Sequence, residues 1–186
     1  DEHGATSPLR TELAAFSNPR FSPDGQRLAM DVATPSRDLW IYDWVRDTPV
    51  RLTSGPTDSS APVWSPDGRD IAFSSKRGDG RTYNLYVMRA DGTGTPQRLA
   101  TSKGHQIAGS WHPTGRYLVY NEQAPDTGFD LWVLPLEGNS TTGWKPGTPT
   151  LFLRTLAVEQ NPEFSPDGRW IAYQSDESGK FEVYVR

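Results

Sequence analysis

The chain contains no cysteine, which excludes disulfide bridges and thiolate metal sites. No apolar stretch approaches the roughly 20 residues that cross a bilayer, so we expect a soluble chain without membrane insertion. Acidic residues outnumber basic ones, which gives a formal net charge of −4. The sequence therefore predicts no nucleic-acid partner. From these absences we expect a soluble protein without disulfide bridges.

Motifs for covalent catalysis and phosphate binding are missing as well. No G-x-S-x-G nucleophile elbow occurs anywhere in the chain. No glycine loop of the form G-x-x-x-x-G-K-[ST] occurs either. The sequence thus argues against a serine hydrolase of the elbow type and against a P-loop nucleotide-binding site.

Turn-forming and aromatic residues are abundant instead. The chain has 17 Gly and 16 Pro, with seven each of Trp, Tyr and Phe. Glycine and proline spread evenly along a chain indicate many short elements joined by tight turns, and large flat rings pack well between stacked sheets. This composition predicts an all-β fold.

One motif recurs along the whole chain. Ser-Pro-Asp-Gly begins at Ser22, Ser65 and Ser165, and a degenerate copy, His-Pro-Thr-Gly, begins at His112. An aromatic residue precedes each copy and a short apolar run follows it. Because proline fixes the turn and glycine takes its left-handed position, each copy predicts a hairpin turn rather than an active site. Repetition at intervals of about 40 to 55 residues indicates β-propeller blades.

Each repeat is expected to form a blade that is a four-stranded antiparallel meander. The last repeat is too short for a fourth strand, whereas residues 8–14 look like a fourth strand without a blade of its own. We expect this strand to complete a blade, either within its own chain or in a second copy. The prediction is a single propeller domain over residues 1–186, with blades at residues 18–60, 61–106, 107–160 and 161–186.

The pattern (F/W)-S-P-D-G-(R/Q)-x-(I/L)-A, followed by (D/N)-L-(W/Y)-(V/I) and R-L-(T/A), resembles the WD-like propeller repeats of TolB-like proteins. Similar repeats occur in the C-terminal regions of bacterial Ser/Thr kinases and in prolyl-oligopeptidase-type propellers. The resemblance covers nearly the whole chain. It implies a β-propeller, a periplasmic or other extracytoplasmic location of bacterial type, and a protein or peptide partner. It implies no particular activity, because propellers have many unrelated functions.

Four blades are fewer than the six or more that the resemblance implies for a complete ring. Two architectures follow. One is a compact four-bladed ring, and the other is an open half-propeller that pairs with a second copy to form an eight-bladed ring. We favour the homodimer, because one isologous pairing covers both open edges.

Two groups of residues are candidates for a site. Asp58, His105 and Glu159 precede the aromatic residues of three blades, at one mouth of the channel, where they predict a divalent cation such as zinc or calcium or else are solvated loop residues. Arg20, Ser110 and Glu163 stand directly before the aromatic residues, inside the channel. They predict a site for a small polar ligand, with an Arg20–Glu163 ion pair across the ring as the alternative.

Two functions follow from these candidates. The first is a non-catalytic scaffold or binding module of the TolB-like type, whose loops and channel mouth bind a protein, a peptide or a small polar ligand. The alternative is a metal-dependent hydrolase acting on an ester, a lactone or a phosphate ester. In that case Asp58, His105 and Glu159 hold the cation that activates water.

Overall fold

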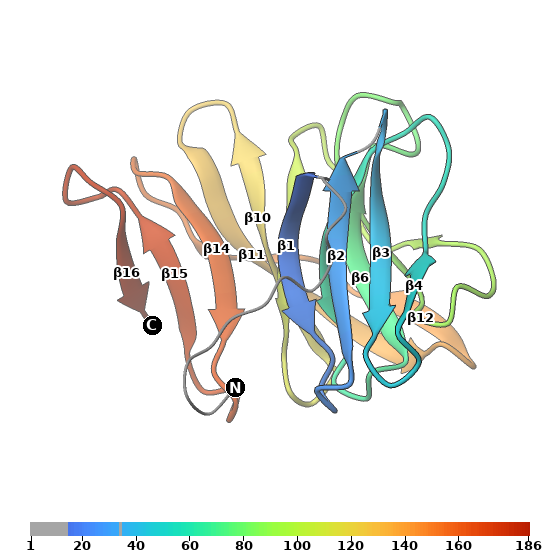
Figure 1. The fold of residues 1–186 in the computed structure, drawn as a ribbon. Coiled ribbons are helices and arrows are strands. Elements are labelled where there is room, and N and C mark those ends of the chain that lie inside the picture. Colours follow the sequence, from blue (N-terminus) through green and yellow to red (C-terminus); the bar gives the residue numbers. More distant parts are fainter. Residues whose placement is uncertain (1–14, 34) are drawn as a thin grey trace, which may run out of the picture.

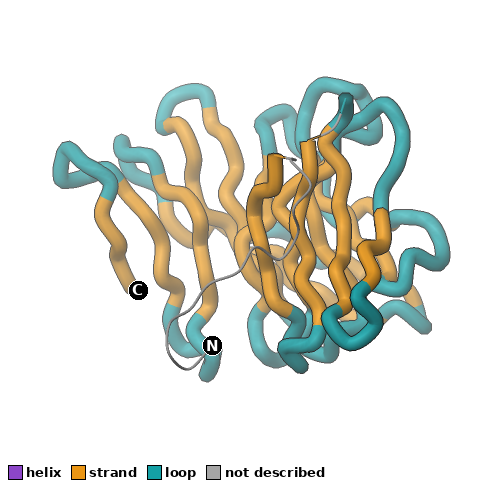
Figure 2. The backbone as a smooth tube through the Cα atoms, in the orientation of Figure 1, coloured by secondary structure: helices purple, strands orange, loops and turns teal. Residues whose placement is uncertain are grey.

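The computed structural model describes residues 15–33 and 35–186, and the strand expected at residues 8–14 lies outside them. In this part of the chain the fold is all-β, with strands joined by loops and no helix (Figure 2). The strands are β1 Ala15–Phe21, β2 Arg27–Ala33, β3 Arg37–Asp43, β4 Thr48–Arg51, β5 Ser59–Trp64, β6 Asp70–Ser75, β7 Asn84–Arg89, β8 Gln97–Arg98, β9 Gln106–Trp111, β10 Tyr117–Ala124, β11 Gly128–Asn139, β12 Gly143–Pro146, β13 Thr150–Leu153, β14 Glu159–Phe164, β15 Ile171–Ser175 and β16 Glu182–Val185.

The strands form four antiparallel sheets that follow one another along the chain, and these are the blades. Blade 1 has the order β1-β2-β3-β4 and blade 2 the order β5-β6-β7-β8. In blade 3, β9, β10 and β11 are consecutive, and both β12 and β13 pair with β11. Blade 4 consists of β14-β15-β16 among the described residues. The all-β fold with four meander blades is thus confirmed.

The Ser-Pro-Asp-Gly copies form the turns between the first and second strands of their blades. In blade 2 the Ser65 hydroxyl donates to Asp67 Oδ1 at 2.6 Å, and Gly68 has a φ of 68°, in the left-handed region. In blade 3 His112 occupies the position of the serine, and its Nδ1 accepts a hydrogen bond of 3.1 Å from the Thr114 N–H within the same turn. The side chains of the motif are therefore occupied in building the turn.

A β-bulge interrupts each inner strand, and the bulges of blades 2 and 3 contact the preceding blade. Asn18 and Ala61, each followed by proline, have φ values of 50° and 52° there. The Ala61 N–H donates to Asp31 Oδ1 of blade 1 at 3.2 Å, and the Ala108 N–H donates to Ser74 Oγ of blade 2 at 2.9 Å. Hydrogen bonds to these bulges therefore join blade 1 to blade 2 and blade 2 to blade 3.

Apolar side chains fill the interfaces between successive blades. Blade 2 lies between two such clusters, whereas blade 4 lies at one end of the array (Figure 1). The strand β16 exposes Val183 and Val185 there. The cluster between blades 2 and 3 contains Val63, Ala72, Leu85, Val87, Leu99, Ala108, Trp111, Leu118, Tyr120, Leu134, Leu136 and Trp144.

Candidate functional site

A cavity of about 580 Å³ lies where the four inner strands meet on the turn side of the channel, and we call it the channel cavity. Each inner strand contributes the same three positions to its wall: the residue before the aromatic residue, the aromatic residue, and the proline of the following turn. Arg20, Ser110 and Glu163 all occupy the first of these positions, and Val63 is their apolar counterpart in blade 2. The three side chains proposed from sequence therefore line one cavity.

Arg20 and Glu163 form an ion pair between the first and fourth inner strands. Arg20 Nη1 lies 2.7 Å from Glu163 Oε2, and the two side chains are 40% and 50% exposed. An ion pair this exposed stabilises a protein by at most about 1 kcal/mol. The ion pair that was the alternative role of these residues is thus present. Both charged groups remain accessible, so a ligand can displace one partner of the pair and bind the other.

The Ser110 hydroxyl connects blades 3 and 4. It accepts a hydrogen bond of 2.6 Å from the backbone N–H of Phe164 and is buried. A hydroxyl that accepts one hydrogen bond still has its own O–H to donate. Ser110 therefore supports the wall of the channel cavity and can donate one hydrogen bond to a bound group.

The residues proposed for a metal site have other partners. Asp58 Oδ2 accepts a hydrogen bond of 3.0 Å from Lys76 Nζ, and Asp58 Oδ1 accepts one of 3.1 Å from the Arg37 N–H. The Arg37 N–H and then Lys76 hold the pKa of Asp58 below its ordinary value. His105 Nδ1 accepts a hydrogen bond of 3.1 Å from the Tyr83 N–H.

Glu159 is fully buried, unlike Asp58 and His105. Thr155 donates to its Oε1, while its Oε2 has no hydrogen-bond partner, and burial raises the pKa of this carboxyl. Its place in the blade explains the difference: Glu159 lies opposite Ser175 in blade 4, as Ser59 lies opposite Ser75 in blade 2. Glu159 therefore corresponds to Ser59 rather than to the neighbouring Asp58. Because side chains alternate between the faces of a strand, an offset of one residue changes the face.

Among residues 15–33 and 35–186, no group of three His, Asp or Glu side chains could hold a metal ion. The structure thus does not bring Asp58, His105 and Glu159 together as one ligand set. Asp58 and His105 both lie beside Tyr83, whereas Glu159 belongs to the interior of blade 4.

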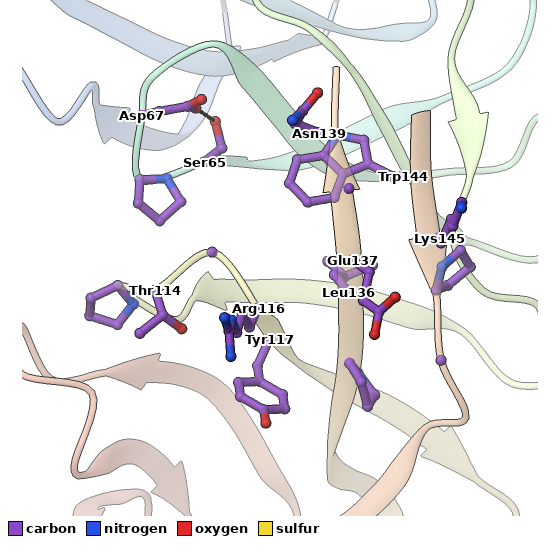
Figure 3. A pocket seen from close by; sticks show the side chains of 17 residues that line it. Ser65, Asp67, Thr114, Arg116, Tyr117, Leu136, Glu137, Asn139, Trp144 and Lys145 are labelled. Atoms are coloured by element: carbon purple, nitrogen blue, oxygen red, sulfur yellow. Dashed lines mark hydrogen bonds between the residues drawn. The ribbon is translucent and has the colours of Figure 1, made fainter. Parts of the chain in front are cut away.

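A second and larger cavity, of about 1060 Å³, lies on the turn face of the molecule and was not predicted from the sequence (Figure 3). We call it the turn-face groove. Its walls are the turn of blade 2, the turn of blade 3, and the hairpin that β11 forms with β12. This hairpin is the only part of the four described sheets that adds a strand to the meander. A long insert after the third strand of blade 3 was its only sequence signal.

The described residues thus form a β-propeller array of four blades that is built from turn-linked repeats. The family profile described as "TolB beta propeller domain" matches residues 10–143, which is more than half of the chain. The chain belongs to this family.

Two curated proteins illustrate the similarity. The chain is 26% identical to the uncharacterized peptidase YuxL of Bacillus subtilis, over 94% of this chain and 32% of that protein. It is 29% identical to an uncharacterized protein of Agrobacterium fabrum, over 91% of this chain and 54% of that protein. The chain therefore spans between about a third and about half of the length of these relatives.

Solved structures show the same fold. A putative TolB from Agrobacterium tumefaciens superposes with a TM-score of 0.79 at 23% identity, covering 95% of this chain and 60% of that one. TolB from Acinetobacter baumannii superposes with a TM-score of 0.66 at 22% identity, covering 90% and 39% of the two chains. The propeller expected from the repeats is thereby confirmed. In the described part of the chain, no helix is suited to cross a membrane.

Proposed function

We propose that this chain is a non-catalytic binding module of the TolB-like type, and that its channel cavity binds a polar group of a protein or peptide partner. The observation that carries the proposal is the common placement of Arg20, Ser110 and Glu163 in the wall of the channel cavity. Together they present a cation, an anion and a hydroxyl. Since a peptide offers amide, carboxylate and ammonium groups, these three side chains can pair with it in a defined orientation.

A reversal of the ion pair tests this proposal. The double variant Arg20→Glu with Glu163→Arg keeps an ion pair across the channel cavity but exchanges the positions of its charges. Ten-residue peptides enriched from a random library by the unchanged protein are then measured by fluorescence anisotropy. We expect the double variant to bind them about tenfold or more weakly, because hydrogen bonds to charged groups contribute about 1.5 to 3 kcal/mol.

The control is the thermal stability of the same variant, which should change little because the pair is exposed. Equal peptide affinity in the unchanged protein and the double variant would show that the pair is structural. Enrichment of no peptide at all would also contradict the proposal.

We propose in addition that two copies pair through their outer blades to form an eight-bladed ring. The support is an exposed apolar surface at β16, made by Val183 and Val185 of the strand and by Phe181 directly before it. Apolar side chains on an uncovered blade face favour burial against another sheet. Light scattering should give twice the mass of the chain. The variant Val183→Lys with Val185→Lys should give the mass of one chain, and a monomeric unchanged protein contradicts the pairing.

The metal-dependent hydrolase stays a prediction that the geometry does not support, because its three proposed ligands have separate partners. Elemental analysis for zinc and calcium after purification addresses it directly. An extracytoplasmic location is likewise a proposal, supported by the similarity to TolB proteins.

A further inference from the structure

The turn-face groove has a preformed outer wall. The side chain of Gln97, in blade 2, bonds to the backbone of Trp144 in the hairpin: it accepts from the Trp144 N–H at 3.1 Å and donates to the Trp144 carbonyl. The buried indole of Trp144 packs against Trp111 with ring centroids 5.0 Å apart. The hairpin is thus fixed to the interface of blades 2 and 3. A partner does not have to order this wall on binding, which reduces the entropic cost of association.

The groove and the channel cavity are neighbours. Pro66 and Pro113 line both of them, so the two cavities meet at the turns of blades 2 and 3. An extended chain advances about 3.3 Å per residue, so a segment of several residues is long enough to lie in both. The shape suits an extended segment better than a compact ligand.

Four charged side chains line the groove, and neither of its two cations, Arg116 and Lys145, has an ion pair within the described residues. The Asp67 carboxylate accepts hydrogen bonds from the Ser65 hydroxyl and the Arg69 N–H. Glu137 and Lys145 are direct cross-strand partners in the hairpin, so their charges offset each other locally.

Arg116 is the remaining charge. Its side chain is exposed and has no ion pair or hydrogen bond within the described residues, and it lies next to Tyr117, which is 41% exposed. Figure 3 shows both residues on the same wall of the groove. A guanidinium group binds a carboxylate through two parallel hydrogen bonds, and a phenol ring beside it offers an apolar surface.

We infer that the turn-face groove docks an extended peptide segment of a partner protein that carries an acidic side chain next to an apolar one. The carboxylate pairs with Arg116, the apolar residue packs on Tyr117, and the segment continues past Pro66 and Pro113 toward the channel cavity. This inference rests on the proposed function for the peptide nature of the partner. It adds a second contact site, and it names the chemistry that the site selects.

The experiment uses the ten-residue peptides enriched from the random library and, for each acidic peptide, a counterpart with Gln in place of Glu or Asn in place of Asp. We expect the enriched peptides to contain an acidic residue beside an apolar one. Arg116→Ala should weaken their binding about tenfold, the amide counterparts should bind the unchanged protein equally weakly, and combining the two changes should cause no further loss.

The repeat supplies matched controls. Arg69 and Arg169 follow the turns of blades 2 and 4 as Arg116 follows that of blade 3, and all three are exposed. Arg69→Ala and Arg169→Ala should leave binding unchanged, because neither residue lines the groove. Similarly, Tyr117→Ala should weaken binding several-fold, whereas Trp170→Ala, at the equivalent position of blade 4, should not.

The outcomes separate the two sites. If the reversed ion pair loses binding and Arg116→Ala does not, the channel proposal stands and the groove inference is wrong. If only Arg116→Ala loses binding, the groove binds without the channel. If the three arginine variants lose binding equally, the effect is general electrostatics and the inference is wrong. Failure to enrich any peptide contradicts both.

Discussion

Blades 2 and 4 have nearly the same local sequence and the same register. In each, the second strand reads Ile-Ala followed by an aromatic residue and a short polar run. Phe73 lies opposite Tyr86 in blade 2, and Tyr173 lies opposite Tyr184 in blade 4. Both aromatic pairs are stacked, with ring centroids 5.9 and 5.8 Å apart. The repeat sequence thus determines the internal geometry of a blade.

The two blades differ in what covers them. Leu85 and Val87 in the third strand of blade 2 are 0% and 2% exposed, whereas Val183 and Val185 at the corresponding positions of blade 4 are 72% and 59% exposed. Blade 2 has a neighbour on each face, while blade 4 packs against blade 3 at the end of the described array. The comparison shows that the neighbours, and not the repeat itself, decide how much a residue stabilises the fold.

Truncation at one matched position gives the largest expected difference. Leu85→Ala removes a fully buried side chain and should lower the free energy of unfolding by about 3 kcal/mol, because it also leaves a cavity. At concentrations too low for the proposed pairing of two copies, Val183→Ala should change it by less than about 0.5 kcal/mol. Urea denaturation monitored by tryptophan fluorescence measures both. Equal losses would mean that blade 4 is covered in solution, as it would be in a ring of two copies.

A smaller difference is expected at the polar residue of the second strand. Ser74 in blade 2 is buried and accepts the Ala108 N–H at 2.9 Å. Among the described residues, the side chain of Gln174, its counterpart, accepts a hydrogen bond only from Asn161 of its own blade, at 3.0 Å. Ser74→Ala leaves that N–H unsatisfied and should lower the unfolding free energy by about 2 kcal/mol. Gln174→Ala should have almost no effect. A comparable loss in both variants would contradict the role of the bulge as a link between blades.

The smallest effect should depend on pH. Glu159 occupies the position of Ser59 but is a buried carboxyl with a raised pKa and one oxygen without a partner. The folded state therefore holds its proton more tightly than the unfolded state, so stability falls as pH rises from the ordinary value of 4.5 through the folded pKa. Glu159→Gln should raise the unfolding free energy by about 1 kcal/mol at neutral pH, and this gain should disappear in acid. If Glu159→Gln instead destabilises the protein and chelation does the same, Glu159 is a metal ligand.

Local features could be predicted from the sequence because they depend on neighbouring residues. Each turn forms through contacts between residues two to five positions apart, such as Ser65 with Asp67, and each repeat carries its own copy of them. The order of the strands followed from the order of these turns. The aromatic residue has the same place in every inner strand. The position of the residues directly before it could therefore be predicted, and these include Arg20, Ser110 and Glu163 in the channel cavity.

The rest depends on contacts between distant residues or on the face of a strand. Gln97 and Trp144 come from different blades, and no local sequence pattern predicts their hydrogen bonds. Glu159 stands five residues before its aromatic residue, whereas Asp58 stands six before its own, so Glu159 is one residue out of phase with Asp58. Whether Asp58 is free or paired also could not be predicted, since Lys76 reaches it from the far side of a hairpin.

The hairpin formed by β11 and β12 has a further consequence for the way the molecule opens. Because Gln97 binds its backbone and Trp111 packs on its indole, blades 2 and 3 separate only if the hairpin detaches at the same time. These two blades therefore behave as one cooperative unit, and blade 4 detaches before them. Amide hydrogens of β6, β7, β9 and β10 should exchange last, and a protease acting on the native chain should cut first in the loop between β15 and β16.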